Sequence, residues 1–123
     1  MNGEAERAAA QAELDARMAV TAAERTVADV RFGELADRQR AAWERHRAAE
    51  DLLTQARQDG GAEMIAAAAE RERGAYAEAD ETARECIDEM QDITAAGLAS
   101  TGALLDQYSK TQGAPERELE AGQ

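Results

Sequence analysis

Two long stretches of the chain contain no proline, and a single strong helix break lies between them. Residues 4–58 hold one glycine, residues 62–110 hold three, and Asp59-Gly60-Gly61 separates the two stretches. Ala, Glu, Arg, Gln and Leu dominate both, and these residues enter a helix at the lowest cost. Paired glycines each cost a helix ~1 kcal/mol relative to alanine and favour its end. The sequence therefore predicts helices over residues 4–58 and 62–110, joined by a turn at residues 59–61.

Hydrophobic periodicity indicates that the two helices pack against each other. In the first helix, steps of four and three residues alternate in the heptad pattern of a packing seam. These positions are Leu14, Met18, Thr21, Arg25, Ala28, Phe32, Leu35, Gln39, Ala42, His46, Ala49 and Leu53. The stripe predicted for the second helix comprises Ile65, Ala69, Glu72, Tyr76, Ala79, Ala83, Ile87, Met90, Thr94, Leu98, Thr101, Leu105 and Tyr108, with Cys86, Ile93 and Leu104 on its flank. Residues 1–112 are thus expected to form an all-α, coiled-coil-like antiparallel hairpin, with Trp43 near Tyr76.

The end of the second helix allows more than one interpretation. The stripe keeps its phase across Gly97 and Gly102, which favours a continuous helix with a bend near residues 97–102. A loop over residues 95–102 between two shorter helices is the alternative. After Lys110 the pattern fades, and residues 113–123 are predicted to form a flexible acidic tail.

A hairpin of this composition has little material for a core of its own. Hydrophobic residues make up 44% of the chain, but most are alanine, and aromatic residues make up 3%. A second apolar set on the first helix (Val20, Val27 and Val30) lies away from the seam. Exposed valines on an Ala-rich helix are one interpretation. We predict instead that they dock another helix, in a four-helix bundle with a second copy or a complex with a different helical protein. The predicted partner interface comprises Val20, Val27, Val30, Phe32, Leu35 and Trp43.

The formal net charge of −12 is concentrated in the second half of the chain. Five acidic residues recur there at three- and four-residue spacing: Glu78, Glu81, Glu85, Asp88 and Asp92. A solvated face is one interpretation, and a docking surface for a basic partner is the other. Four arginines of the first helix offer partners for these acids in the same or a second chain: Arg38, Arg40, Arg45 and Arg47. Charge of this sign argues against direct binding of nucleic acid.

The sequence contains no pattern that is typical of catalysis. It has one histidine and one cysteine, and an antiparallel hairpin would not place His46 and Cys86 level with each other. Cys86 is expected to pack as a small hydrophobic residue. His46 is expected to act as a polar register residue in the seam. Without a second histidine or a Glu-x-x-His pattern, we expect no metal site, and we expect no cofactor and no enzyme activity.

Neither membrane insertion nor a cleavable signal peptide is expected from the sequence. No run of ~18 apolar residues exists, and Met1-Asn2-Gly3-Glu4-Ala5-Glu6 lacks the basic and apolar regions of a signal peptide. The expected location is the cytoplasm, or outside the cell after export without a cleavable signal.

One local motif resembles a known family. Tyr76-Ala77-Glu78-Ala79-Asp80 looks like the Y-x-x-x-D/E signal of the small helical-hairpin proteins exported by type VII (ESX) secretion systems. That resemblance implies a short, acidic, dimeric hairpin in which Tyr76 and Asp80 are the positions of the secretion signal. The chain departs from the family in lacking W-x-G at its turn, since Trp43 is followed by Glu44-Arg45. The family's signal also lies near the end of the second helix, whereas Tyr76 is near its start.

Three functional hypotheses follow from these patterns. The first is a non-catalytic helical interaction protein that pairs with itself or with another helical protein, as an adaptor, secretion-associated partner or assembly factor. The second is an inhibitor whose acidic second helix occupies a basic nucleic-acid-binding site. The third is a structural or scaffolding component of a larger particle.

Overall fold

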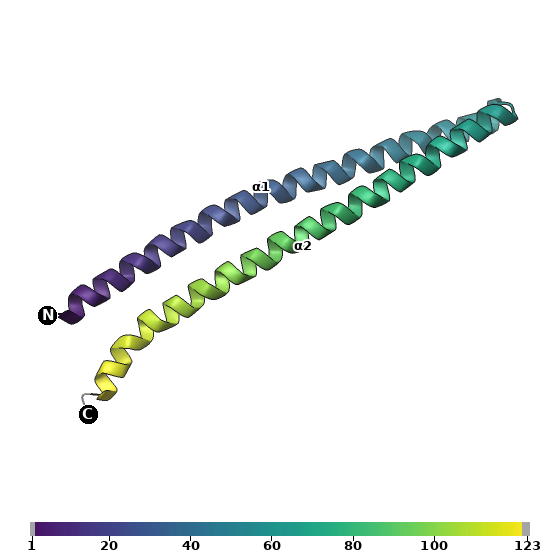
Figure 1. Cartoon of the computed structure of the whole chain (residues 1–123). Coiled ribbons are helices and arrows are strands. Elements are labelled where there is room, and N and C mark those ends of the chain that lie inside the picture. Colours follow the sequence, from purple (N-terminus) through teal and green to yellow (C-terminus); the bar gives the residue numbers. More distant parts are fainter. Residues whose placement is uncertain (1, 122–123) are drawn as a thin grey trace. The chain divides into compact units, whose positions relative to one another are not determined.

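The computed structural model of the chain consists of two helices, and it describes the backbone of residues 2–121 and the side chains of residues 3–112. Helix α1 spans Asn2–Asp59 and helix α2 spans Ala62–Ala121 (Figure 1). The predicted all-α hairpin is therefore confirmed. Glu4 and Glu63 lie in the first turns and Arg57 in the last turn of α1, where each charge complements the helix dipole. Among the described residues, no helix is long and apolar enough to cross a membrane.

Helix α2 continues without interruption through Gly97 and Gly102, as in the continuous interpretation of the sequence. It also extends to Ala121, beyond Lys110, where the sequence predicted the helix to end. The side chains of the predicted tail, residues 113–123, lie outside the described residues, and the flexibility of the tail stays a prediction.

The turn between the helices needs a glycine for steric reasons. The amide of Gly60 donates a hydrogen bond of 2.7 Å to the carbonyl of Ala56, and the amide of Ile65 donates one of 3.1 Å to the carbonyl of Gly61. No glycine of the described chain has a positive φ, so Gly60 does not supply a left-handed residue. A Cβ at Gly60 would instead lie 2.8 Å from the Ala56 carbonyl oxygen and 3.1 Å from the Cβ of Met64. Glycine is required because the backbone itself occupies that space.

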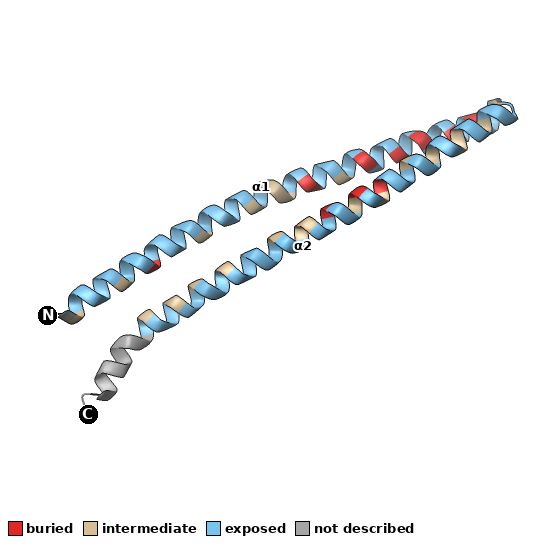
Figure 2. Cartoon of the chain, in the orientation of Figure 1, coloured by how far each residue is buried: buried red, intermediate tan, exposed pale blue. Residues whose placement is uncertain are grey.

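The chain divides into two compact units. Unit 2 (Val30–Gln91) contains the turn and the facing segments of both helices, and unit 1 combines Met1–Asp29 with Asp92–Gln123. The buried residues of unit 2 lie on the facing sides of α1 and α2 (Figure 2). They are Leu35, Ala42, His46, Ala49, Leu53, Ala56, Ala79, Thr82 and Cys86. Most are small, so the helices of unit 2 pack through a narrow seam, and Cys86 is a buried free thiol within it.

Unit 1 has far less buried surface. Leu14 is the one buried residue among its described side chains. Polar contacts link its two helical segments: Thr21 and Ser100 lie 3.5 Å apart, Ser100 donates to Glu24 at 2.8 Å, and Gln107 donates to Glu13 at 3.5 Å. Unit 1 is therefore a helix pair joined mainly by exposed polar contacts.

The seam predicted for α1 matches the buried positions of unit 2, but the stripe predicted for α2 is only partly correct. Tyr76 and Ile87, which the sequence placed in the stripe, are 52% and 48% exposed, whereas the predicted flank residue Cys86 is fully buried. Ala79, a member of the predicted stripe, is buried in the seam, and so is Thr82, which the sequence did not place there. The prediction was wrong at Tyr76 and Ile87, whose large side chains lie beside the seam.

The turn gives a stability prediction with a matched control. Gly60→Ala should destabilise the chain by about 1–3 kcal/mol, since a Cβ there would force the backbone at Ala56 to shift. A Cβ at Gly61 meets nothing within 4 Å, so Gly61→Ala should be neutral or stabilise by up to ~1 kcal/mol through a less flexible unfolded chain. Urea unfolding followed by circular dichroism measures both. Equal effects of the two substitutions would contradict the steric role of Gly60.

Candidate functional site

Three arginine–glutamate ion pairs cross between α1 and α2 in unit 2. Arg31 contacts Glu89 at 2.6 Å, Arg38 contacts Glu85 at 2.7 Å, and Arg45 contacts Glu78 at 3.0 Å. The arginines are spaced by seven residues, so a heptad repeat places them on one side of α1. The proposed pairing of Arg38 and Arg45 with acids of the opposing helix is thus confirmed, whereas Arg40 contacts Asp37 on its own helix.

The Arg31–Glu89 pair has the most favourable geometry of the three. Nε and a terminal amino group of Arg31 donate to the two carboxylate oxygens of Glu89 at 2.6 and 2.9 Å, and Arg31 also donates to Glu34. These hydrogen bonds lower the pKa of Glu89 and raise that of Arg31. Both side chains are partly exposed, so the pair defines geometry more than it adds stability.

The predicted acidic face is divided between two environments. Glu78 and Glu85 are engaged by arginines of the same hairpin, and the remaining members (Glu81, Asp88 and Asp92) are exposed. A basic partner would have to displace two arginines to use the whole face. The inhibitor hypothesis stays a prediction, and the geometry of unit 2 gives it no support.

The one histidine of the chain lies at the centre of a polar cluster in unit 2. The His46 side chain is buried, with 8% of its surface exposed. Its Nε2 lies 2.9 Å from a carboxylate oxygen of Glu72 on α2, and its Nδ1 lies 3.1 Å from one of Glu50, one turn further along α1. The rings of Trp43 and Tyr76 meet the imidazole edge to face, with centroids 5.7 and 5.4 Å away. The Trp43 and Tyr76 rings are 6.0 Å apart, which confirms the predicted proximity.

Sequence reasoning placed His46 and Glu72 in the two seams but did not pair them. The register that brings Trp43 to Tyr76 also brings position 46 within one residue of position 72, which is the signal that would have identified the contact. Glu50 follows His46 by four residues and so shares its face of α1. The helix register predicted from Trp43 and Tyr76 was therefore sufficient to predict the contacts of this cluster.

The predicted partner-interface residues have unequal exposure. Val20 and Val27 in unit 1 and Val30 in unit 2 are exposed, as expected for a surface available to another helix. Trp43 is 40% exposed and Phe32 is half-buried. Leu35 has no exposed surface and belongs to the core of unit 2, so another chain would reach it only if the hairpin opened.

A second exposed apolar surface lies on α2 in unit 1, and it is formed by residues that the sequence wrongly placed in the packing stripe. Leu98, Leu105 and Tyr108 share one face by helical spacing and are 70%, 61% and 51% exposed. We call this face the α2 strip. Residues 93–105, which contain most of it, carry no charge, although charged residues make up 33% of the chain. A Cβ at Gly97 or Gly102 would meet nothing within 4 Å, so the hairpin's own packing does not require these glycines.

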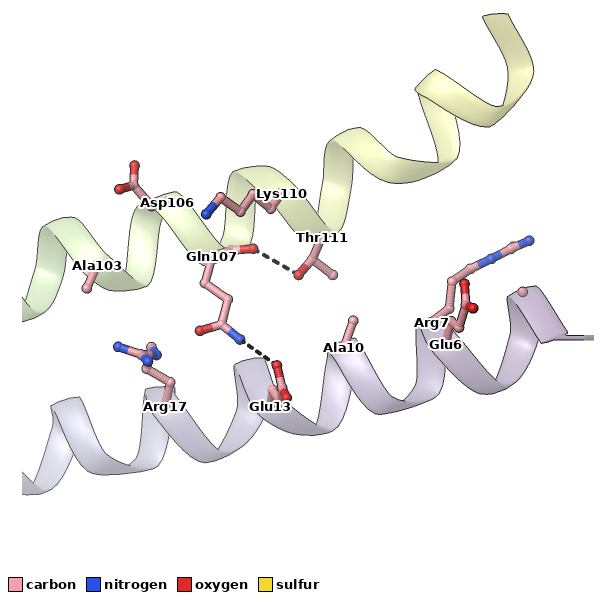
Figure 3. Close-up of a pocket in the computed structure, with 11 residues that line it drawn as sticks. Glu6, Arg7, Ala10, Glu13, Arg17, Ala103, Asp106, Gln107, Lys110 and Thr111 are labelled. Carbon is pink, nitrogen blue, oxygen red and sulfur yellow. Dashed lines mark hydrogen bonds between the residues drawn. The ribbon is translucent and has the colours of Figure 1, made fainter. Parts of the chain in front are cut away.

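An open groove of about 630 Å³ lies between α1 and α2 in unit 1. Small residues at Gly3, Ala10 and Ala103 leave the space unfilled, and charged side chains of both signs surround it (Figure 3). The side-chain amide of Gln107 reaches across it to Glu13, and the hydroxyl of Thr111 donates to the backbone carbonyl of Gln107 at 2.9 Å. The mixed charges select no particular ligand.

The residues of the resemblance to secreted hairpin proteins lie one turn apart on α2. Tyr76 is half exposed and packs against Trp43 and His46, and Asp80 contacts Arg84 on its own helix at 3.1 Å. Their role in export stays a prediction. Comparisons of the chain with models of known families, with curated proteins and with solved structures give no match.

The Arg31–Glu89 pair gives a prediction for the dependence of stability on pH. The pKa of Glu89 is lower in the folded chain than its ordinary value. The ion pair therefore contributes its full stabilisation at pH values above the ordinary pKa. That stabilisation is lost as the pH falls through the lowered pKa of the folded chain. Glu89→Gln should therefore unfold at lower urea concentration than the native chain at neutral pH, and this difference should shrink as the pH falls to about 3.

The control for this prediction is Asp88→Asn, which removes a neighbouring exposed carboxylate. Because Asp88 is exposed and belongs to none of the three arginine–glutamate pairs, its replacement should not show the same dependence on pH. A difference between Glu89→Gln and the native chain that persists unchanged at acidic pH would contradict the assignment.

Proposed function

We propose that the chain is a non-catalytic helical interaction protein that acts by pairing with a second copy of itself in a four-helix bundle. An adaptor or assembly role is compatible with this mode of action. The observation that carries the proposal is the α2 strip, a large exposed apolar face on the unit with the least buried surface.

Unit 1 lacks the packed apolar surface that would stabilise two long helices. Long helices in water derive most of their stability from packing of an apolar face, and unit 1 buries one described leucine. Removal of apolar surface from water contributes roughly 25 cal/mol per Å², so burial of Leu98 and Leu105 would each add about 1–2 kcal/mol. A partner helix on the α2 strip supplies the missing contact.

Charge favours a second copy as that partner. Two chains with a net charge of −12 repel each other over most of their surfaces, but residues 93–105 are uncharged. Leu98 and Leu105 are seven residues apart, which is two turns of helix. A two-fold axis near Thr101 and Gly102 would therefore place Leu98 of each copy against Leu105 of the other, an isologous contact. The absence of side chains at Gly97 and Gly102 would let the helices approach closely.

The valine face of α1 is the competing surface for the same function. Val20 and Val27 share one side of α1 in unit 1 and are also exposed. We favour the α2 strip because its apolar side chains are larger and because the neighbouring residues carry no charge. A helical partner of different sequence, or many copies in a larger particle, would use the same surfaces.

The oligomeric state of surface variants tests the proposal. Light scattering at tens of micromolar should give a dimer for the native chain and a monomer for the double variant Leu98→Asp with Leu105→Asp. Each buried, unpaired carboxylate should cost about 3 kcal/mol, or roughly 100-fold in Kd. The matched control Val27→Asp alters an equally exposed apolar residue of the same unit and should remain dimeric.

Two other outcomes would contradict the dimer or place its interface elsewhere. A native chain that is monomeric at this concentration contradicts pairing with a second copy. Loss of the dimer in Val27→Asp together with its retention in the leucine variant moves the interface to the valine face of α1.

The two-fold geometry gives a separate prediction. Thr101→Cys should form a disulfide-linked dimer under mild oxidation, because position 101 would lie beside the two-fold axis. Ala99→Cys, two residues away and also exposed but on another side of α2, should not. Native Cys86 is fully buried and should not contribute. Denaturing electrophoresis without reductant measures the linked fraction, and equal cross-linking at both positions would contradict the geometry.

A further inference from the structure

We propose that His46, Glu50 and Glu72 of unit 2 bind one divalent transition-metal ion, represented here by Zn²⁺. The inference is independent of the pairing of chains, since all three residues lie within a single unit. The sequence contains no metal-binding motif at these positions.

Geometry provides the first support. One ligand atom from each of the three residues lies within 4.8 Å of the other two. His46 and Glu50 are one helical turn apart on α1, a spacing that directs two side chains toward a common point. Glu72 reaches the imidazole from α2 at 2.9 Å, so the packing of the two helices brings the third residue to the other two.

The donor set suits this class of ion. Imidazole nitrogen and carboxylate oxygen are both ligands of Zn²⁺, and three protein ligands leave one position of a tetrahedral ion for water. Two carboxylates balance the charge of the dication when the imidazole is neutral. A negatively charged chain also raises the local concentration of cations.

Two members of the cluster are largely buried, and the third is exposed enough to move. His46 is held by the rings of Trp43 and Tyr76, which fix the orientation of the imidazole. Glu72 is three-quarters buried and already directed at Nε2, whereas Glu50 is more than half exposed. Glu50 can therefore change rotamer and bring its carboxylate to an ion held by Nε2 of His46 and by Glu72. The exposed side of Glu50 is also the entry path.

The alternative state of the cluster contains no metal. A neutral imidazole has one donor and one acceptor, so the ring donates to both carboxylates at once when it carries both protons. Such an imidazolium would bridge Glu50 and Glu72 and join the two helices. A test must therefore separate metal binding from protonation.

The experiment uses the fact that the chain has one histidine, so its ring signals need no assignment by mutation. Metal-free full-length chain at neutral pH is titrated with ZnCl₂ and followed by proton NMR of the imidazole and by calorimetry. We expect the His46 signals to shift and to saturate at one equivalent. Glu72→Gln, which keeps the shape of the side chain, should weaken the affinity by at least ~10-fold, and Glu50→Gln should also weaken it.

Glu70→Gln is the matched control, because it removes an exposed carboxylate two residues from Glu72 and should leave the affinity unchanged. Circular dichroism of each variant checks that the helices are retained. His46 signals that ZnCl₂ does not move, or equal affinities of the native chain and Glu72→Gln, would overturn the metal site and leave a hydrogen-bonded contact between the two helices. Light scattering with and without Zn²⁺ keeps this result separate from the dimer, since loss of either one does not require loss of the other.

Discussion

The register between the two helices is the constraint on which the rest of unit 2 depends. Its seam is made largely of alanine and other small residues, and such a seam discriminates poorly between alternative alignments. The Arg31, Arg38 and Arg45 pairs each contribute little, but they share one alignment. A slip of one heptad toward the turn would place Arg45 against Arg71 instead of Glu78, and His46 against Ile65 instead of Glu72. Together with the two-glycine turn, charge thus selects the alignment that apolar contacts leave open.

Sequence reasoning succeeded for the helices and for the seam of α1, and it was only partly right for the stripe of α2. The heptad positions of α1 were recognised because Leu35 and Leu53 stand out from polar neighbours, and the break at Gly60 is unambiguous. On α2 the prediction included the seam residue Ala79 but not Thr82, and it placed Tyr76 and Ile87 in the stripe although both are about half exposed. Periodicity identifies the most apolar face of a helix, and on α2 several large residues of that face lie beside the contact with α1 rather than in it.

The candidate sites show the same division. The arginine–glutamate pairs could be anticipated from charge spacing, but the contact of His46 with Glu72 needed the register, which connects positions 26 residues apart. The sequence indicated that Gly60 lies in the turn, but it did not indicate why glycine is needed there. The close approach to the Ala56 carbonyl is a property of the folded turn. The spacing of residues along one helix can be predicted from the sequence. Contacts between the two helices also require their alignment, and a seam of small residues is compatible with more than one alignment.

The unequal packing of the two units has a consequence for how the chain opens. Unit 2 closes a short loop and buries nearly all of the core, so it should be the cooperative element that forms early and exchanges its amide hydrogens last. Unit 1 should open at a much smaller free-energy cost while unit 2 stays folded. Any ligand that binds folded unit 1 then stabilises it by mass action. The protection of the amide hydrogens of unit 1 against exchange therefore increases with ligand concentration. Proteolytic lifetime of the terminal segments would thereby report on occupancy, and an unoccupied chain would be degraded from its ends.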